Sequence, residues 1–197
     1  MRRGAELTLI NPIRCNADCL RDLDKLGAVK HVIRLGGFHG ADDPFYINRY
    51  RATFWAPIGE LGYQTPLIDK VLLDGGELPF TDALLFCFKG ARVPEAAICI
   101  TRGNGLLLTC DAIQHYGDYS QNNLAARMAM PFIGFPKRVI IGPIWLQRAT
   151  TINASLRPEF DRLLKMKFDA LFAAHGTYLA KGAHAGVRAA VDATFDA

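Results

Sequence analysis

Apolar and polar positions in the first fifty residues alternate between strand spacing and helix spacing. Ala5–Ile10 and Val29–Leu35 are short apolar runs that predict β-strands. Between them, Asn16–Leu26 has leucines at helical spacing, starts with an Asn suited to an N-cap and stops at a glycine, which predicts a helix. After a polar loop, Pro44–Tyr50 forms a short helix opened by its proline. This alternation is typical of an α/β arrangement.

The middle of the chain changes to a pattern of closely spaced strands. Three apolar runs predict strands at Leu84–Phe88, Ala96–Ile100 and Leu106–Thr109. The last two runs are joined by Arg102-Gly103-Asn104-Gly105, a glycine-rich turn typical of a β-hairpin. We therefore expect antiparallel pairing in this part of the chain.

The last third returns to mixed elements. A polar stretch follows Asp111, and outside one short helix the segment up to Thr151 is expected to be irregular. The predicted elements are a helix at Leu124–Met130, a helix from Pro158 to about Met166, a strand at Phe168–Ala174 and a final helix from about Tyr178 to Phe195. The whole pattern predicts an α+β fold of mixed sheets with helices outside.

Composition favours one folded domain spanning residues 1–197. Hydrophobic residues make up 50% of the 197 residues, enough for one compact core. No apolar stretch approaches the roughly 18 to 20 residues that cross a bilayer, and no signal-peptide apolar region follows Arg2 and Arg3. We therefore expect a soluble, cytoplasmic protein.

Charge, cysteine content and missing motifs narrow the classes of partner. The formal net charge is +4 and the basic residues are spread along the chain, so neither nucleic acid nor a membrane is an expected partner. The five cysteines are an odd number, which favours free thiols, and Cys15 and Cys19 alone are weak evidence for zinc. Neither a G-x-S-x-G elbow nor a G-x-G-x-x-G loop occurs. A small-molecule substrate is the expected partner.

Histidine and carboxylate side chains follow three separate apolar runs. His39 and Asp43 come after the second strand, whereas Asp111 and His175 each follow one later strand. Loops at strand ends are where a rigid scaffold aims functional side chains. Because imidazoles and carboxylates are metal ligands, this pattern predicts a metal site.

Three segments, in their order and spacing, resemble the metallo-β-lactamase superfamily of hydrolases. They are Leu35-Gly36-Gly37-Phe38-His39-Gly40-Ala41-Asp42-Asp43, Leu106-Leu107-Leu108-Thr109-Cys110-Asp111 and Leu171-Phe172-Ala173-Ala174-His175-Gly176. Two further segments, Asn11-Pro12-Ile13-Arg14 and Ala56-Pro57-Ile58-Gly59, are similar to those of a poorly characterised branch. The resemblance covers nearly the whole chain, which begins late relative to a typical member. It implies a four-layer αββα sandwich with a metal site at one edge of two packed sheets.

The first metal motif of that superfamily is His-x-His-x-Asp-His, and only part of it is present. His39 and Asp43 match its first His and its Asp. Ala41 and Pro44 stand at the other two His positions and cannot bind a metal. The resemblance therefore implies that a complete two-metal site is lost.

The remaining ligand positions lie further along the chain. Glu95 stands where the third metal His belongs, Asp111 matches the bridging Asp and His175 matches the final His. With His39 and Asp43, these residues imply one divalent ion, Mn, Fe or Zn.

Such an ion implies a metal-dependent hydrolase acting on a small ester, lactone, thioester or phosphoester. A bound divalent ion lowers the pKa of water from roughly 15.7 towards 7. Asp43 takes the catalytic role in this interpretation, because the matching Asp of the superfamily orients the water and can accept its proton.

Other roles fit some of these residues. Asp43, or Asp42 beside it, also fits the N-cap of the short helix, and Glu95 also fits a solvated strand start. His115 is a further candidate ligand or a surface residue. The two lost His positions favour an alternative function, a metal-poor binding or regulatory protein on the same fold. An oxidoreductase using iron in the same pocket requires the same ligand types.

Overall fold

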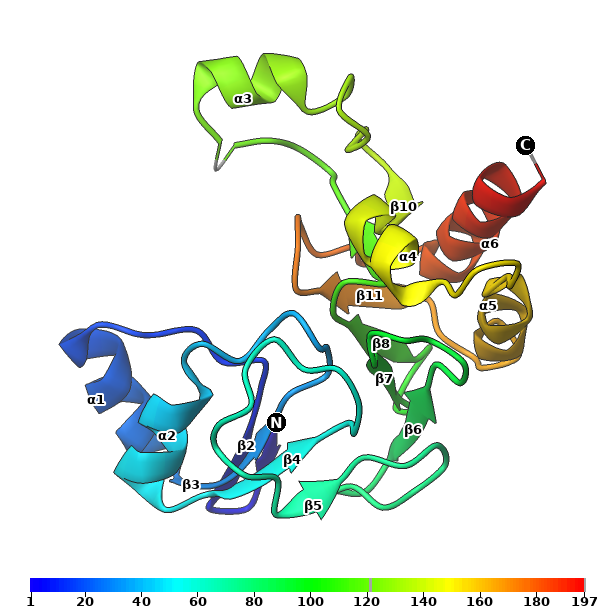
Figure 1. The fold of residues 1–197 in the computed structure, drawn as a ribbon. Helices are drawn as coiled ribbons and strands as arrows, with labels where there is room; N and C mark the ends of the chain where they lie inside the picture. The colour runs from blue at the N-terminus through cyan, green and yellow to red at the C-terminus, as the bar shows by residue number, and fades with distance from the viewer. Residues whose placement is uncertain (121, 197) are drawn as a thin grey trace.

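Two β-sheets lie between helices in the computed structural model of the chain, which describes residues 1–120 and 122–196 (Figure 1). The first sheet consists, in spatial order, of β1 (Arg2–Arg3), β2 (Glu6–Ile10), β3 (Ala28–Ile33), β4 (Thr53–Ala56) and β5 (Lys70–Val71). β1 pairs antiparallel with β2, and the other neighbours pair parallel. Helices α1 (Ala17–Leu26) and α2 (Asp43–Tyr50) connect the parallel strands and cover the outer face.

The second sheet is mixed and has the spatial order β11, β8, β7, β6. Its strands are β6 (Ala83–Cys87), β7 (Ala96–Ile100), β8 (Leu106–Thr109) and β11 (Ala170–Ala173). β6, β7 and β8 pair antiparallel, as the hairpin pattern predicted, whereas β11 returns parallel to β8. A small sheet of β9 (Ile113–His115) and β10 (Val139–Ile141) lies beside it, and the remaining helices are α3 (Leu124–Ala129), α4 (Pro143–Ala149), α5 (Arg157–Leu163) and α6 (Ala183–Phe195).

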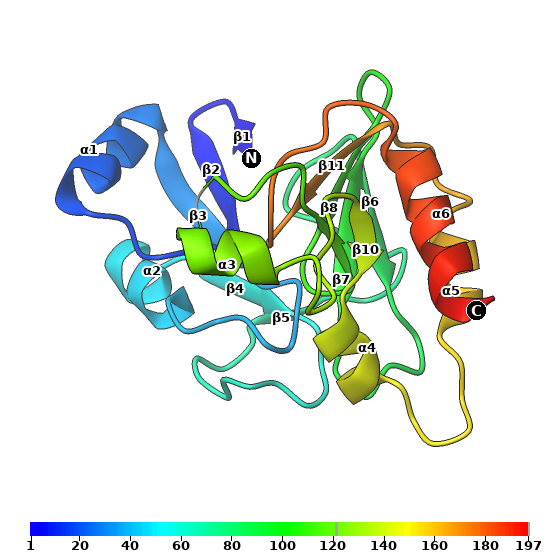
Figure 2. The ribbon, with the colours of Figure 1, turned by 90° about the horizontal axis from the view of Figure 1, so that it is seen from above.

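Three apolar cores separate four layers. One core lies between the first sheet and helices α1 and α2, around Val32 and Phe54. A second core, around Ile33 and Ile98, lies between the two sheets. The third core joins the second sheet to α4, α5 and α6, and its aromatic centre includes Phe160. The order of layers is therefore α, β, β, α, which confirms the predicted four-layer sandwich (Figures 1 and 2).

Most predicted elements are present, but the segment before Thr151 is not irregular. It contains β10 and α4, and the polar stretch after Asp111 contains the buried strand β9. These strands have three residues each, too few positions for a periodic pattern. The last helix begins at Ala183 rather than near Tyr178, because Leu179 pairs with Leu171 of β11 and the Gly182 N–H donates to Asp169.

The connection between β9 and β10 projects from the rest of the chain and carries α3 (Figure 1). Its described part exposes four large apolar side chains, namely Leu124, Met128, Phe132 and Ile133. At its base, Tyr119 donates a hydrogen bond to the Phe135 carbonyl at 2.6 Å. Among the described residues, no helix combines the length and the apolar character needed to cross a membrane.

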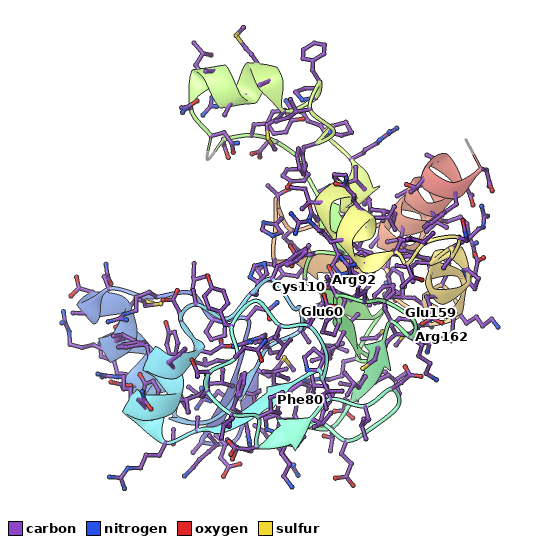
Figure 3. All side chains as sticks on the ribbon, viewed as in Figure 1. Glu60, Phe80, Arg92, Cys110, Glu159 and Arg162 are labelled. Carbon is purple, nitrogen blue, oxygen red and sulfur yellow. The ribbon has the colours of Figure 1, made fainter. Side chains whose placement is uncertain are left out.

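An arginine joins α5 to the edge of the second sheet. Arg162 lies beside Glu159 of the same helix, at 2.7 Å, and pairs with Asp74 at 2.9 Å (Figure 3). Its guanidinium also stacks over Phe86 of β6, 3.9 Å from the ring centre. This network lowers the pKa of Asp74 to about 2: burial alone would raise it, and hydrogen bonds from Cys87, Lys89 and Arg162 outweigh that effect.

We predict that Gly105→Ala destabilises the fold far more than Gly103→Ala. Both glycines have positive φ in the same hairpin, +85° and +62°, so both substitutions strain the backbone by about 1 to 2 kcal/mol. At Gly105 the new Cβ would also lie 2.3 Å from the Lys167 carbonyl oxygen, whereas at Gly103 it would meet nothing within 4 Å.

The measurement is the free energy of unfolding in urea. The expected difference between the two variants is about 2 kcal/mol, the usual size of an overpacking penalty. An equal loss of unfolding free energy in the two variants would contradict the close approach of the hairpin to the residues just before β11.

Candidate metal centre

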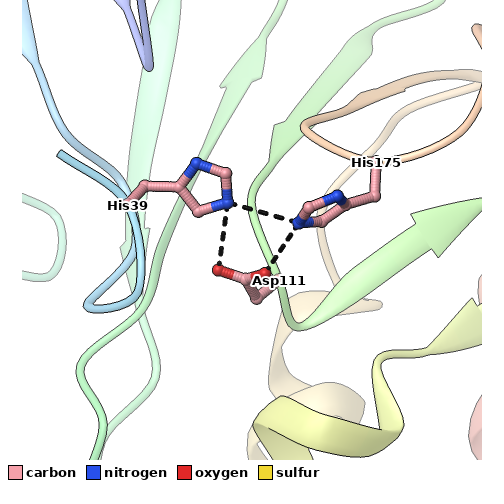
Figure 4. A group of neighbouring side chains, drawn as sticks. All are labelled: His39, Asp111 and His175. Carbon is pink, nitrogen blue, oxygen red and sulfur yellow. Dashed lines mark hydrogen bonds and ion pairs between the residues drawn. The ribbon is translucent and has the colours of Figure 1, made fainter. Parts of the chain in front are cut away.

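Three of the predicted ligands meet at one edge of the two sheets. His39 comes from the loop after β3, Asp111 follows β8 and His175 follows β11. The two imidazole Nε2 atoms lie 3.2 Å apart, and Asp111 lies 2.9 Å from His175 Nε2 and 3.4 Å from His39 Nε2 (Figure 4). The sequence places these residues far apart, and the ends of three strands bring them together.

Strand register explains why Asp111 and His175 are neighbours. β8 and β11 run parallel with Thr109 opposite Ala173, so the residues two positions beyond each pair leave the sheet side by side. The backbone N–H of Ala174 donates to the Thr109 carbonyl at 3.1 Å and extends this pairing past the strand ends. Parallel pairing thus fixes two of the three side chains before any ligand binds.

The loop that carries His39 is fixed by backbone contacts between the sheets. The N–H of Gly37 donates to the Pro94 carbonyl at 2.9 Å, and the N–H of Ala96 donates to the Leu35 carbonyl at 2.8 Å. The His39 loop is therefore attached to the start of β7.

The spacing of the three ligand atoms fits a single metal ion. Ligand atoms of one tetrahedral or octahedral ion, at bond lengths of about 2.0 to 2.2 Å, lie about 2.8 to 3.6 Å from one another. The three observed separations are 2.9, 3.2 and 3.4 Å. Two imidazoles and one carboxylate also suit Zn, Fe or Mn. The residues present therefore fit the metal that the sequence predicts.

The site is open on one side and charged at its base. The Asp111 side chain is 9% exposed, whereas the His39 and His175 side chains are 25% and 40% exposed. Burial alone would raise the pKa of Asp111, but hydrogen bonds and attraction from the two imidazoles outweigh burial and hold the pKa below its ordinary value. Asp111 is therefore a carboxylate at neutral pH.

A pocket of about 350 Å³ opens over the three ligands. Its aromatic walls come from Phe38, Tyr116, Phe135 and Trp145, in loops and helices far apart in the chain. These four residues could not be found from the sequence, because an aromatic side chain there carries no signal that separates a pocket wall from a core. The pocket is large enough for a small molecule and has few polar groups besides the ligands.

Glu95 is buried next to the site, where it binds the loop that carries Asp111. Its Oε1 accepts a hydrogen bond from the backbone N–H of Ala112 at 2.7 Å, and the residue is 1% exposed. Glu95 is thus buried, not a solvated strand start. It does not line the 350 Å³ pocket, so its role as a ligand stays a prediction.

The second carboxyl oxygen of Glu95 lies in a crowded, buried space. Oε2 has no hydrogen-bond partner among the described residues, and a Cβ on Gly36 would lie 2.7 Å from it and 2.6 Å from Cys110 Sγ. Glu95, Cys110 and Asp111 form a second group of close ligand-type atoms. Burial, followed by the negative charge of Asp111, raises the pKa of Glu95 well above its ordinary value, although backbone N–H groups oppose this.

Asp43 is not part of the group of three ligands. Its Oδ2 accepts a hydrogen bond from Arg34 Nε at 2.7 Å, and both side chains are almost completely buried. Burial raises the pKa of Asp43, and the Arg34 guanidinium opposes part of that shift. A charged residue inside the apolar strand Val29–Leu35 is the sequence signal that could have revealed this pair.

The Arg34–Asp43 pair supports the loop that carries His39. Arg34 Nη1 donates to the Tyr63 carbonyl at 2.7 Å, and a Cβ on Gly40 would lie 2.3 Å from the guanidinium carbon. The loop thus passes directly over the guanidinium, one residue after His39. Asp43 is paired with Arg34 rather than with the other predicted ligands, and its roles as ligand and proton acceptor remain predictions.

Asp42 and His115 both form contacts that stabilise loops outside the group of three ligands. Asp42 is the N-cap residue of α2 without a side-chain capping bond, and its Oδ2 instead accepts the N–H of Arg14 at 2.9 Å. His115 is buried in β9, where its Nδ1 lies 2.8 Å from the Thr177 carbonyl. It therefore attaches β9 to the loop after His175 and is in neither ligand group. All five cysteines are free.

No protein-family model and no curated protein matches the sequence. Solved structures do match. The metallo-β-lactamase from Staphylococcus aureus subsp. aureus COL has a TM-score of 0.56 at 12% identity, and the match covers 99% of this chain and 61% of that chain. The FIM-1 metallo-β-lactamase from Pseudomonas aeruginosa in the mono-zinc form has a TM-score of 0.59 at 7% identity. This match covers 98% of this chain and 81% of that chain.

An archaeal metallo-β-lactamase superfamily protein from Sulfolobus tokodaii is also similar, with a TM-score of 0.54 at 15% identity and coverage of 87% of this chain and 70% of that chain. These likenesses show that the chain has the metallo-β-lactamase fold, as the sequence resemblance implied. At these identities they show the fold alone.

We predict that Asp43→Ala costs about 3 to 5 kcal/mol of folding stability, because it leaves the Arg34 guanidinium buried without its carboxylate. The double substitution Arg34→Met with Asp43→Leu removes both charges and should recover most of that loss. Urea unfolding measures the stability of each protein. If the double variant folds well but binds metal far more weakly than the parent, Asp43 is a ligand and its pairing with Arg34 is not its main role.

We predict that Glu95→Gln preserves the Asp111 loop and that Glu95→Ala does not. Gln keeps an oxygen acceptor for the Ala112 N–H, whereas Ala removes it and costs about 1 to 3 kcal/mol. Because the folded-state pKa of Glu95 is raised, the parent loses stability relative to Glu95→Gln as pH rises from about 4.3 through that pKa.

The measurements for Glu95 are urea unfolding of the metal-free proteins at several pH values and metal affinity at neutral pH. Glu95→Gln should bind metal within about threefold of the parent. A loss of metal affinity as large as that of a ligand substitution, about 100-fold or more, would instead make Glu95 a ligand.

Proposed function

We propose that this chain is a hydrolase that uses one divalent metal ion, Zn, Fe or Mn, held by His39, Asp111 and His175. The observation that carries the proposal is the convergence of two imidazole nitrogens and one carboxylate, 2.9 to 3.4 Å apart, beneath a small-molecule pocket. The substrate class is a small ester, lactone, thioester or phosphoester.

One ion, rather than two, accounts for the residues present. Ala41 and Pro44 occupy two positions where the superfamily motif has histidines, and Asp43 is already paired with Arg34. The FIM-1 structure from Pseudomonas aeruginosa is described as a mono-zinc form, so one ion on this fold has a parallel. The fold and the ligand types support metal binding, and the substrate class is our proposal.

In this proposal, three residues bind the metal and the aromatic residues of the pocket surround the substrate. His39 and His175 offer neutral nitrogens, and Asp111 supplies the negative charge that a divalent cation needs. When bound, the metal supplies Lewis acidity and lowers the pKa of water. Phe38, Tyr116 and Trp145 exclude bulk solvent from one side of the substrate, while the exposed side of His175 leaves a path for entry.

We predict that His39→Ala, Asp111→Ala and His175→Ala each weaken metal binding by at least about 100-fold, since even outer-shell partners of metal ligands contribute about 10- to 100-fold. His31→Ala is the matched control, because His31 contacts Trp55 in the first sheet and is in neither ligand group. Metal content and affinity are measured by elemental analysis and chelator competition for Zn, Mn and Fe. Unfolding curves show whether each variant folds.

Activity is tested with a panel of ester, lactone, thioester and phosphoester substrates. Hydrolysis of one class should disappear after chelator treatment and return on adding one equivalent of metal. A parent protein that binds none of the three metals would exclude the hydrolase and favour a metal-poor binding protein instead. An Asp111→Ala protein with the parent's metal affinity would exclude this ligand set.

A further inference from the structure

A second, larger cavity of about 650 Å³ lies on the other side of His39. Residues from the ends of β2 and α1 form one wall, and residues of β8 and β11 form the other. His39 lines both this cavity and the 350 Å³ pocket of the metal centre. A molecule with its reacting group at the metal centre therefore has this space directly beside it. We call it the side cavity.

The wall of the side cavity is mainly apolar. None of the described residues lining it is Asp, Glu, Lys or Arg. Two of its polar side chains already have partners within the protein: Asn11 Oδ1 accepts the N–H of Leu35 at 2.8 Å, and Tyr46 donates to the Ile13 carbonyl at 2.6 Å.

Two further polar groups of the wall are occupied in the same way. Thr109 donates its hydroxyl to the Ile113 carbonyl at 2.8 Å, and the Met1 amino group donates to the Thr8 carbonyl at 2.7 Å. A ligand in the side cavity therefore meets mainly carbon atoms, so a charged ligand would lose its hydration with little compensation.

Phe172 is the side chain that such a ligand would cover. It lies on the edge strand β11, opposite Leu108 in the register, and both line the side cavity. Its side chain stays 57% exposed, with the Tyr178 ring at 6.2 Å between centres. An exposed aromatic side chain at the wall of an apolar cavity gains hydrophobic contact only when a ligand enters.

We propose that the side cavity binds an uncharged apolar group of the substrate, an acyl or alkyl chain, while the ester linkage lies at the metal centre. The proposal rests on the hydrolase function proposed above and adds to it the substrate class, an ester with an apolar chain. A volume of about 650 Å³ is within the usual range of small-ligand pockets, about 300 to 1,000 Å³. Phe172 is then a specificity residue of the hydrolase.

Binding is tested first, without any need for activity. The probe is N-phenyl-1-naphthylamine, an uncharged aromatic dye whose fluorescence rises in apolar sites, with 1-octanol as the competitor. The parent should bind one equivalent, and Phe172→Asp should weaken binding at least about 10-fold because it places a charge in the wall. Phe172→Leu should retain binding.

Leu84→Asp is the matched control. Leu84 lies on β6, the opposite edge strand of the same sheet, is 53% exposed and does not line the side cavity. The Leu84→Asp variant should bind the dye with the affinity of the parent. If Phe172→Asp and Leu84→Asp bind equally, or if octanol does not displace the dye, the side cavity is not an apolar binding site and the proposal is overturned.

Chain-length dependence then tests the link to catalysis. With metal-loaded protein, kcat/KM for 4-nitrophenyl esters should rise from acetate to octanoate by about fourfold for each methylene that becomes buried. Phe172→Asp should flatten this dependence, whereas Leu84→Asp should keep it. Metal-dependent hydrolysis with no preference for long chains would overturn this proposal while the hydrolase stands. Octanol-competed dye binding without metal binding or hydrolysis would overturn both the hydrolase and the substrate assigned here.

Discussion

The attachment of the two sheets to each other around Glu95 is the contact on which the metal centre depends. Backbone hydrogen bonds on both sides of Glu95 fix the start of β7 to the loop after β3, and its buried carboxyl group binds the N–H of Ala112. One residue therefore links the loop that carries His39 to the loop that carries Asp111. A buried hydrogen-bond acceptor without a donor is costly in free energy. The hydrogen bond between Glu95 and the Ala112 N–H therefore stabilises both the fold and the geometry of the site.

The site differs from a full superfamily motif in a way that local electrostatics explains. Pro44 lies in the first turn of α2 at a position where the motif has a histidine, and Asp43 is paired with Arg34. The guanidinium is a fixed cation beneath the His39 loop. His39, Asp111 and His175 face the open pocket and have both the ligand types and the spacing that suit one ion.

Two cavities meet at His39, and they differ in chemistry. The 350 Å³ pocket contains the ligands and aromatic walls, whereas the described residues that line the 650 Å³ side cavity are mainly apolar and include no Asp, Glu, Lys or Arg. The difference arises from the fold, because the first lies over the strand ends and the second lies between the strands β2 and β11. Loop residues after the strands line the first cavity, and mainly apolar residues at the ends of β2, β8 and β11 line the second.

The sequence by itself determined the element types, the antiparallel hairpin at Gly103–Gly105 and the positions of His39, Asp111 and His175 at strand ends, because hydrophobic period and turn residues act locally. It did not determine the three-residue strands β9 and β10, which have too few positions for a period. Only the tertiary structure decided which carboxylates face the pocket. Asp43 and Glu95 match ligand positions in the sequence, and the structure pairs Asp43 with Arg34 and Glu95 with the Ala112 N–H. A carboxylate binds whichever donor packing brings within hydrogen-bond distance, and that distance is set by residues remote in the chain.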